Sequence, residues 1–456
     1  MTGARLGLAL SVAALAFPSA GFAQTATPVS AIGDDDGLKV GATLRVRYET
    51  IDGQVRPGFN ASDDLLSTRT TLAATYDAKP IRFGVELFDS RAYLADAKSP
   101  VSANEVNTFE LVQAYVAGDI DNALGAGTIL TLQGGRFLLN LGSRRLVAAD
   151  DYRNTTNSFT GARADIKARS LSATLIYVLP QVRLPDALPR VLDNAVAPDK
   201  ESFDQVLWGG VLSGAKAVGT ATAEVSFFHL GERDAPGRPT RNRSLNTITA
   251  RLVRDPQPGA LDYEVEGMYQ FGHVRDGLAP TASLLEASAT FVHAELGYGL
   301  PGSWKPHVSL EFDRASGDGP RGAYGRFDTL FGMRRADLAP AGIYNAVGRA
   351  NIVTPGIRLE AAPGKRIDGM LTYRLMWLAD RTDAFSTTGV RDPTGRSGSF
   401  AGQQVDARLR YWIAPGKLRF EIDGVWLAKG AFLRNAPNAR RTGDTRYLSV
   451  NLSAML

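Results

Sequence analysis

Alternating apolar and polar positions dominate the chain. In the stretch LDYEVEGMYQFG (261–272), one set of alternate positions is apolar and the other carries Asp262, Glu264 and Glu266. A helix turns by about 100° per residue and would scatter these carboxylates around its circumference, whereas a strand sends successive side chains to opposite faces. The stretch therefore predicts a strand with one apolar face and one charged face in contact with water.

The same alternation recurs in many other segments. It is clearest in LKVGATLRVRYE (38–49), VDARLRYWI (405–413) and LRFEIDGVW (418–426), and weaker versions fill most of the sequence between them. No segment of comparable length has the period of a helix. The chain is therefore predicted to be all-β.

The connections between the expected strands are of two kinds. Short links rich in Pro and Gly, such as PQPG (256–259) and the two PGK turns (363–365 and 415–417), alternate with long polar loops. Short turns at one end and long loops at the other are typical of an up-and-down antiparallel transmembrane β-barrel. Counting the segments predicts about 18 strands, which would make residues 38–456 one barrel domain.

The N-terminus has the three-part form of a secretory signal. Arg5 precedes an apolar run over residues 6–17, and small residues follow at Gly21 and Ala23. Cleavage is expected after Ala23, so residues 1–23 would be a signal peptide and residues 24–37 a short periplasmic segment. With the barrel, this predicts location in the cell outer membrane.

Composition excludes several classes of protein. The 456 residues include no cysteine, so an exported chain would fold without disulfides, and no later run approaches the roughly 18 apolar residues of a transmembrane helix. The net charge of +4 comes from 51 basic and 47 acidic residues that are interspersed along the chain. Nucleic-acid binding is therefore not expected, because it needs basic residues gathered on one surface.

The charged face of the strands indicates a lumen filled with water. An arginine facing lipid at mid-depth would cost roughly 2–4 kcal/mol, so a whole face of charges cannot point outward. Glu264, Glu266, Arg374 and Arg408 are accordingly predicted to line the interior. A barrel of 16 to 18 strands is wide enough to hold an aqueous channel.

One stretch is rich in arginine and indicates the charge of the solute. GGRFLLNLGSRRLVAADDYRNTTNSFTGARAD (134–165) contains five arginines within residues 136–163. Guanidinium groups stay charged and bind carboxylates through two hydrogen bonds, which favours an anionic solute. Asp150, Asp151 and Asp165 lie among them, so simple ion pairing within the wall is the alternative.

At this stretch the sequence resembles the alginate export family of outer-membrane porins. Other matching pieces lie in the same order along the chain: DSR (89–91), QAYV (113–116), EFDRASGDG (311–319), RFDTLFGMRR (326–335) and GRANI (348–352). The pattern differs at Tyr152, where tryptophan is expected, and at the terminal Leu456, where an aromatic residue is usual.

The resemblance implies an eighteen-stranded barrel with an arginine-rich constriction that passes an acidic polysaccharide such as alginate out of the cell. It implies that a long loop over residues 314–350 folds at or into a mouth of the barrel. It also implies solute-contacting roles for one group of residues, namely Asp89, Arg91, Arg136, Arg145, Arg153 and Arg163.

The sequence leaves two other functions open besides a polysaccharide channel, a porin for small solutes and an enzyme. A general or nutrient-uptake porin on the same scaffold would pass small anions or oligosaccharides. An outer-membrane hydrolase could use Glu264 and Glu266, which would lie about 7 Å apart on one strand face. The four histidines have no metal-binding spacing and no GxSxG turn occurs, so no catalytic residue, metal or cofactor is predicted. A periplasmic export partner, if present, would dock at the PGK turns.

Overall fold

The computed structural model describes residues 37–320, 322–334 and 337–456. The expected signal peptide and the first part of the expected periplasmic segment (24–36) lie outside these ranges. The described chain forms a single antiparallel sheet of 18 strands, and the helices within it are too short to span a membrane. The elements are β1 (Leu38–Asp52), β2 (Ser62–Asp77), β3 (Ile81–Tyr93), β4 (Asn107–Asp121), β5 (Thr128–Leu138), β6 (Ser158–Ala168), β7 (Leu171–Pro180), α1 (Leu188–Leu192), β8 (Gln205–Val218), β9 (Ala221–Glu232), β10 (Ser244–Arg254), β11 (Leu261–Arg275), β12 (Leu284–Gly299), β13 (His307–Ala315), β14 (Ile352–Ala361), β15 (Ile367–Trp377), β16 (Phe400–Ala414), β17 (Leu418–Lys429), α2 (Ala431–Asn435) and β18 (Thr445–Met455).

The sheet closes because β1 pairs with β18 as well as with β2. Ala42 and Leu456 exchange backbone hydrogen bonds of 3.2 and 2.9 Å, and the ladder continues to Asp52 opposite Arg446. A closed barrel has no edge strand, so its backbone groups find partners within the sheet even where water is absent. The predicted class and strand count are thus confirmed.

Apolar side chains cover the outside of the barrel and charged ones face inward. In β1, Leu44 and Val46 are exposed by 46% and 37%, whereas Arg45 and Arg47, which alternate with them, are buried. The same division holds in β11, where Val265 is exposed and Glu264 and its neighbours on that face are buried. The outward set is the one that can contact lipid.

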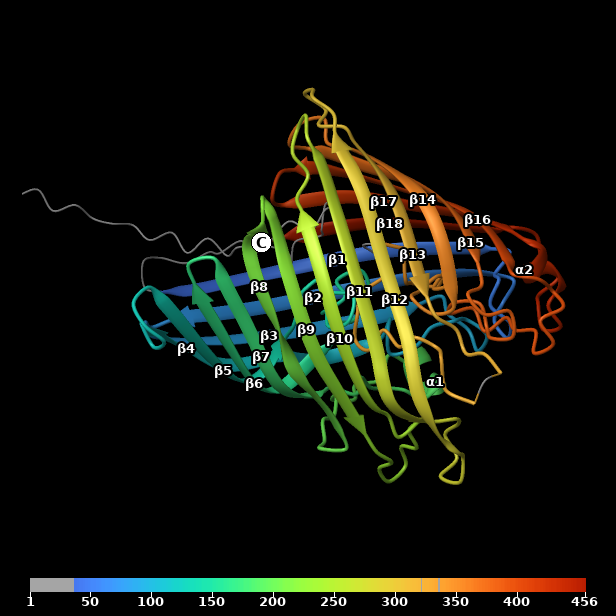
Figure 1. The fold of residues 1–456 in the computed structure, drawn as a ribbon, viewed down its shortest axis with the longest axis horizontal. Coiled ribbons are helices and arrows are strands. Elements are labelled where there is room, and N and C mark those ends of the chain that lie inside the picture. Colours follow the sequence, from blue (N-terminus) through green and yellow to red (C-terminus); the bar gives the residue numbers. More distant parts are fainter. Residues whose placement is uncertain (1–36, 321, 335–336) are drawn as a thin grey trace, which may run out of the picture.

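Long connections gather at one end of the barrel and short turns at the other (Figure 1). A turn of only two residues, 169–170, joins β6 to β7 in a region where the sequence has no evident turn signal. Arg169 occupies this turn with a φ of 35°. The sequence shows no turn signal here because Arg169 takes the left-handed conformation that Gly or Asn usually marks.

Two of the long connections fold into the lumen. We call residues 139–157, between β5 and β6, the first inner loop, and residues 322–334 with 337–351, between β13 and β14, the second inner loop. The Tyr152 hydroxyl lies 2.9 Å from that of Tyr447 on β18, and the Tyr344 hydroxyl donates to Gln404 Oε1 on β16 at 2.6 Å. The interior at this end is therefore packed with protein, although the charged strand faces predict an open water-filled channel.

The opposite faces of β16 lead to a stability prediction. Leu409 is 42% exposed on the outer wall, so Leu409→Arg should lower the free energy of unfolding by about 2–4 kcal/mol in a bilayer. Ile413, 47% exposed near the periplasmic end of the same strand, provides the matched control, and Ile413→Arg should cost only about 0–1 kcal/mol. Denaturant titration in lipid vesicles measures both. An equal loss of unfolding free energy in the two variants would contradict the assignment of this face to the membrane.

Candidate functional site

The two inner loops are joined to each other across the lumen. Val147 and Phe331 form a parallel bridge, in which Ala148 N donates to Phe331 O at 3.1 Å and Phe331 N donates to Leu146 O at 2.9 Å. A third bond, from Met333 N to Arg144 O, measures 3.1 Å. The short ladder satisfies backbone groups that would otherwise be buried without partners. It makes the loops one structural unit, which narrows the lumen.

Arg145 ties this unit to the barrel wall. Its guanidinium lies 2.7 Å from Glu266 Oε2 and also contacts Glu264, both on β11. On the other side, its Nε and Nη2 donate to Asp337 of the second inner loop at 2.9 and 2.8 Å. Because all four groups are buried, removing one partner would leave a charge uncompensated in a region of low polarity.

Asp337 is the shared acceptor of several arginines. Arg349 contacts its carboxylate and Arg374 of β15 donates to its main-chain oxygen. Burial alone would raise the pKa of the Asp337 carboxyl, but the charges of Arg145 and Arg349 hold it well below its ordinary value. Arg374 also pairs with Glu311 at 3.1 Å. This side of the lumen is thus a network in which positive and negative charges alternate.

The opposite side of the lumen has a different chemistry. Arg45 of β1 donates to three main-chain oxygens of the first inner loop, over residues 151–153, and to Asn154 Oδ1. Arg69 of β2 donates to Arg153 O at 3.3 Å and lies 5.1 Å from the Phe88 ring. All of these acceptors are neutral. The bonds fix the guanidinium groups in place without cancelling their charge.

Two further arginines lie side by side at the mouth. Arg153 of the first inner loop and Arg183 of the β7–β8 connection share two amide oxygens. Asn104 Oδ1 accepts from each at 2.9 Å, and Asn157 Oδ1 accepts from them at 2.6 and 2.5 Å. Burial, and after it the charge of Arg153, lowers the pKa of Arg183 to about 9. Asp150, 3.0 Å from Arg153 Nε, offsets part of this positive charge.

Two carboxyls near this arginine pair titrate close to neutrality. Glu105 precedes β4, and burial together with the charge of Glu49 raises its pKa to about 7. Asp199 precedes β8, and burial together with Glu110 raises its pKa to about 7. Both groups are therefore partly protonated at neutral pH, so the positive charge of the mouth depends on pH.

The structure brings together some of the residues predicted to contact solute. Arg145 and Arg153 lie in the first inner loop and Arg374 contacts the second, whereas Glu264 and Glu266 hold Arg145. Arg408 lies on the inward face of β16, opposite Asp423 in register. Two others have their acidic partners outside the inner loops: Arg136, which bridges Glu110 and Glu201 at 2.6 and 2.9 Å, and Arg163, which pairs with Asp165 at 2.7 Å.

Asp89 and Arg91 lie outside the lumen, which differs from the expectation. They pair with each other at 2.9 Å, with exposed fractions of 33% and 38% for the two side chains. Along β3 they share the face of Phe83 and Val85, both of which are exposed. Because alternate residues of a strand share a face, the pair projects from the outer wall near the long-loop end.

Several lumen residues were missed because they lie in loops without periodicity. Asn104, Arg183 and Asp337 follow no strand pattern, and nothing in their local sequence shows what they contact. Asp318, in the SGDG segment, accepts from Gly325 N at 3.0 Å and so ties its own loop together. Among the described residues there is no group of three or more His, Cys, Asp or Glu side chains able to hold a metal.

Comparison with known families gives one match that spans nearly the whole chain. The family model for alginate export matches residues 36–445. Among curated proteins, none matches the chain.

Solved structures with the same fold include outer-membrane proteins of Pseudomonas aeruginosa. OpdK is 12% identical with a TM-score of 0.56, covering 92% of this chain and 99% of its own. OccK2 (OpdF), solved in complex with glucuronate, is 13% identical with a TM-score of 0.55, covering 91% and 98%. At these identities the likeness concerns the fold. The family and the fold are those of outer-membrane channels.

The Arg145 contacts predict how the inner loops are held. Arg145→Ala should destabilise their docking by about 3–5 kcal/mol, because Glu264, Glu266 and Asp337 would each lose a buried cationic partner. Single-channel recordings should then show a larger, fluctuating conductance. Arg233, whose side chain is 67% exposed beside Asp204, is the control, and Arg233→Ala should cost less than about 1 kcal/mol. An unchanged conductance in Arg145→Ala would contradict the anchoring role.

Proposed function

The chain belongs to the alginate export family and forms an outer-membrane channel, and we propose that it passes an acidic polysaccharide, with alginate as the first candidate. The polymer would move along the side of the lumen that carries Arg45, Arg69, Arg153 and Arg183. On that side, the guanidinium groups are held mainly by neutral oxygens, and Asp150 offsets part of the charge of Arg153. The group therefore retains positive charge with which to attract carboxylates.

The observation that carries this proposal is the sharing of Asn104 and Asn157 between Arg153 and Arg183. Two like charges placed together in a buried setting repel each other, and the amide oxygens oppose this only in part. A carboxylate arriving between them would relieve the repulsion and accept two charge-assisted hydrogen bonds. A uronate chain supplies such carboxylates at regular intervals. Each sugar carboxylate would therefore take the place of the one before it as the polymer advances.

A general porin for small anions is the second candidate, and two observations favour it. The inner loops fill much of the lumen at the long-loop end, which suits a monomer better than a polymer. A solved structure with the same fold, OccK2, holds glucuronate. The two candidates predict that binding affinity depends differently on the chain length of the solute.

The two candidates can be separated by current blockade in planar bilayers. Oligouronates should block the current with an affinity that rises with chain length, whereas neutral oligosaccharides of matched length should not block it. Arg183→Gln should weaken the block about tenfold or more, because a charge-assisted hydrogen bond contributes about 1.5–3 kcal/mol. The control is Arg233→Gln, which removes the same charge from an exposed site.

Each possible result of the blockade assay has a distinct meaning. Block by monomeric uronate as strong as by oligomers would favour the small-anion porin over the polymer channel. Block that is insensitive to Arg183→Gln would remove the arginine pair from the pathway. Cation selectivity without any block would contradict an anionic solute altogether.

The carboxyls of Glu105 and Asp199 predict a pH dependence of selectivity. As the pH falls through about 7, both groups gain protons and lose negative charge, so preference for anions over cations should increase. Reversal potentials across a salt gradient measure this preference. Glu105→Gln should reduce the change with pH by removing one titrating group. A preference that decreases on acidification would contradict the placement of these groups beside the pathway.

A periplasmic export partner remains part of the proposal. It would dock at the short turns 363–365 and 415–417, from which Lys365 and Lys417 offer sites for crosslinking.

A further inference from the structure

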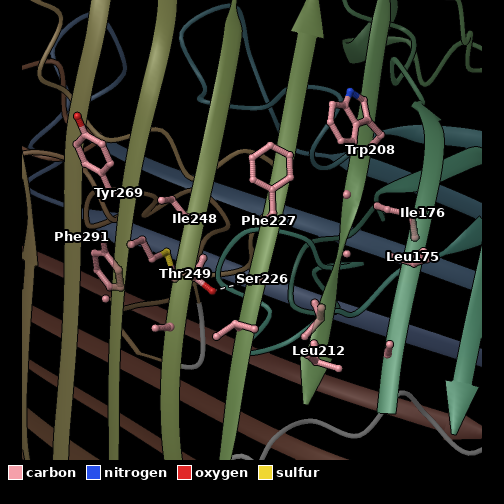
Figure 2. Close-up of a pocket in the computed structure, with 18 of the residues that line it drawn as sticks. Leu175, Ile176, Trp208, Leu212, Ser226, Phe227, Ile248, Thr249, Tyr269 and Phe291 are labelled. Carbon is pink, nitrogen blue, oxygen red and sulfur yellow. Dashed lines mark hydrogen bonds between the residues drawn. The ribbon is translucent and has the colours of Figure 1, made fainter. Parts of the chain in front are cut away.

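The outer wall has a large apolar hollow over β7 to β12. It has a volume of about 1270 Å³. Figure 2 shows Trp208, Phe227 and Tyr269 toward one end of the hollow and Leu212 at the other. Gly267 lines the hollow in the same register row as Leu212 and contributes no side chain. In a membrane, this hollow faces hydrocarbon, so an acyl chain, and not water, would occupy it.

Polar residues lie on the same outer face, directly beyond the aromatic end of the hollow. His229 Nδ1 lies 2.9 Å from Asn246 Oδ1, and the His229 ring lies 5.3 Å from that of Trp208. On the neighbouring strands, exposed His273 lies opposite Glu286, and Ser288 Oγ lies 3.3 Å from the Tyr269 hydroxyl. These groups lie toward the long-loop end of the strands, where a lipid headgroup would be.

A guanidinium also lies beside the hollow. Arg314 is exposed near the end of β13, on the outward face that it shares with Phe312. Its Nη1 donates to Thr290 Oγ1 at 3.3 Å, and Thr290 lines the hollow. An outward arginine at this position suits a phosphate group at the membrane surface.

We propose that this region binds one phosphorylated glycolipid of the outer leaflet. An acyl chain would occupy the hollow, Arg314 would bind a phosphate, and the imidazole, amide, hydroxyl and carboxylate groups would bind sugar hydroxyls. A headgroup with only a phosphate would leave most of these donors and acceptors without a role. The mixture of polar groups therefore favours a sugar headgroup.

A second copy of the chain fits this surface less well. The simplest contact between two copies is two-fold, with the same patch on both subunits. Such a contact would place hollow against hollow and leave a large void, which loses the dispersion contacts that stabilise packing. A flexible acyl chain can fill a concave surface without needing a matching ridge.

The test compares lipid binding to variants of the full barrel. Gly267→Trp should fill the hollow without disturbing the fold, because an added Cβ at Gly267 meets no atom within 4 Å. Gly424 provides the matched control on the far wall. It lies opposite exposed Leu448, and an added Cβ meets only Tyr447 O at 3.9 Å. Arg314→Gln tests the phosphate contact.

Native mass spectrometry of the purified barrel, titrated with rough-type lipopolysaccharide, provides the readout. The wild type and Gly424→Trp should retain one glycolipid, whereas Gly267→Trp should bind it at least about tenfold more weakly. The Arg314→Gln variant should bind the phosphorylated glycolipid no more tightly than the wild type binds the dephosphorylated glycolipid.

Three outcomes would overturn the proposal. One is equal retention of the glycolipid by Gly267→Trp and Gly424→Trp. Another is equally tight binding of phosphatidylglycerol, which would assign the hollow to phospholipid. The third is a wild-type dimer that Gly267→Trp dissociates, which would assign the surface to a second copy.

Discussion

Every backbone N–H and C=O group that enters hydrocarbon must find a partner within the protein, and the architecture of this chain follows from that requirement. A sheet meets it only by closing, which it does here through the pairing of β1 with β18. Once the sheet is closed, its two faces meet different surroundings. Leu44 and Val46 face the membrane, while Arg45 and Arg47 of the same strand face the lumen.

Charges inside the barrel then need partners, because burial of an ion costs several kcal/mol unless another charge or a hydrogen bond offsets the cost. The lumen contains two arrangements that offset this cost of burial. Around Arg145 and Asp337, positive and negative groups alternate, and the result is a firm attachment of the inner loops. Around Arg153 and Arg183, amide oxygens are the shared acceptors, and Asp150 offsets only part of the positive charge. The first arrangement is structural, and the second is suited to an anionic solute.

The candidate site was predictable only in part. The arginine-rich stretch includes Arg145 and Arg153 of the first inner loop, but the sequence does not show that they lie on different sides of the lumen. Their partners were not predictable, since Asp337 is 192 residues from Arg145 along the chain. Asp89 and Arg91 were misplaced because family resemblance does not specify which face of a strand a residue occupies. Alternation with Phe83 and Val85 assigns both to the outer wall.

The sequence by itself determined the class of fold, the number of strands and the two faces of the wall. Each of these follows from alternation with a period of two, which is a property of local backbone geometry and can be read from neighbouring residues. Only the tertiary structure decided which loops enter the lumen, which arginines acquire acidic partners and which keep neutral ones. Loops have no such period, and their contacts exist only after closure brings distant strands around them.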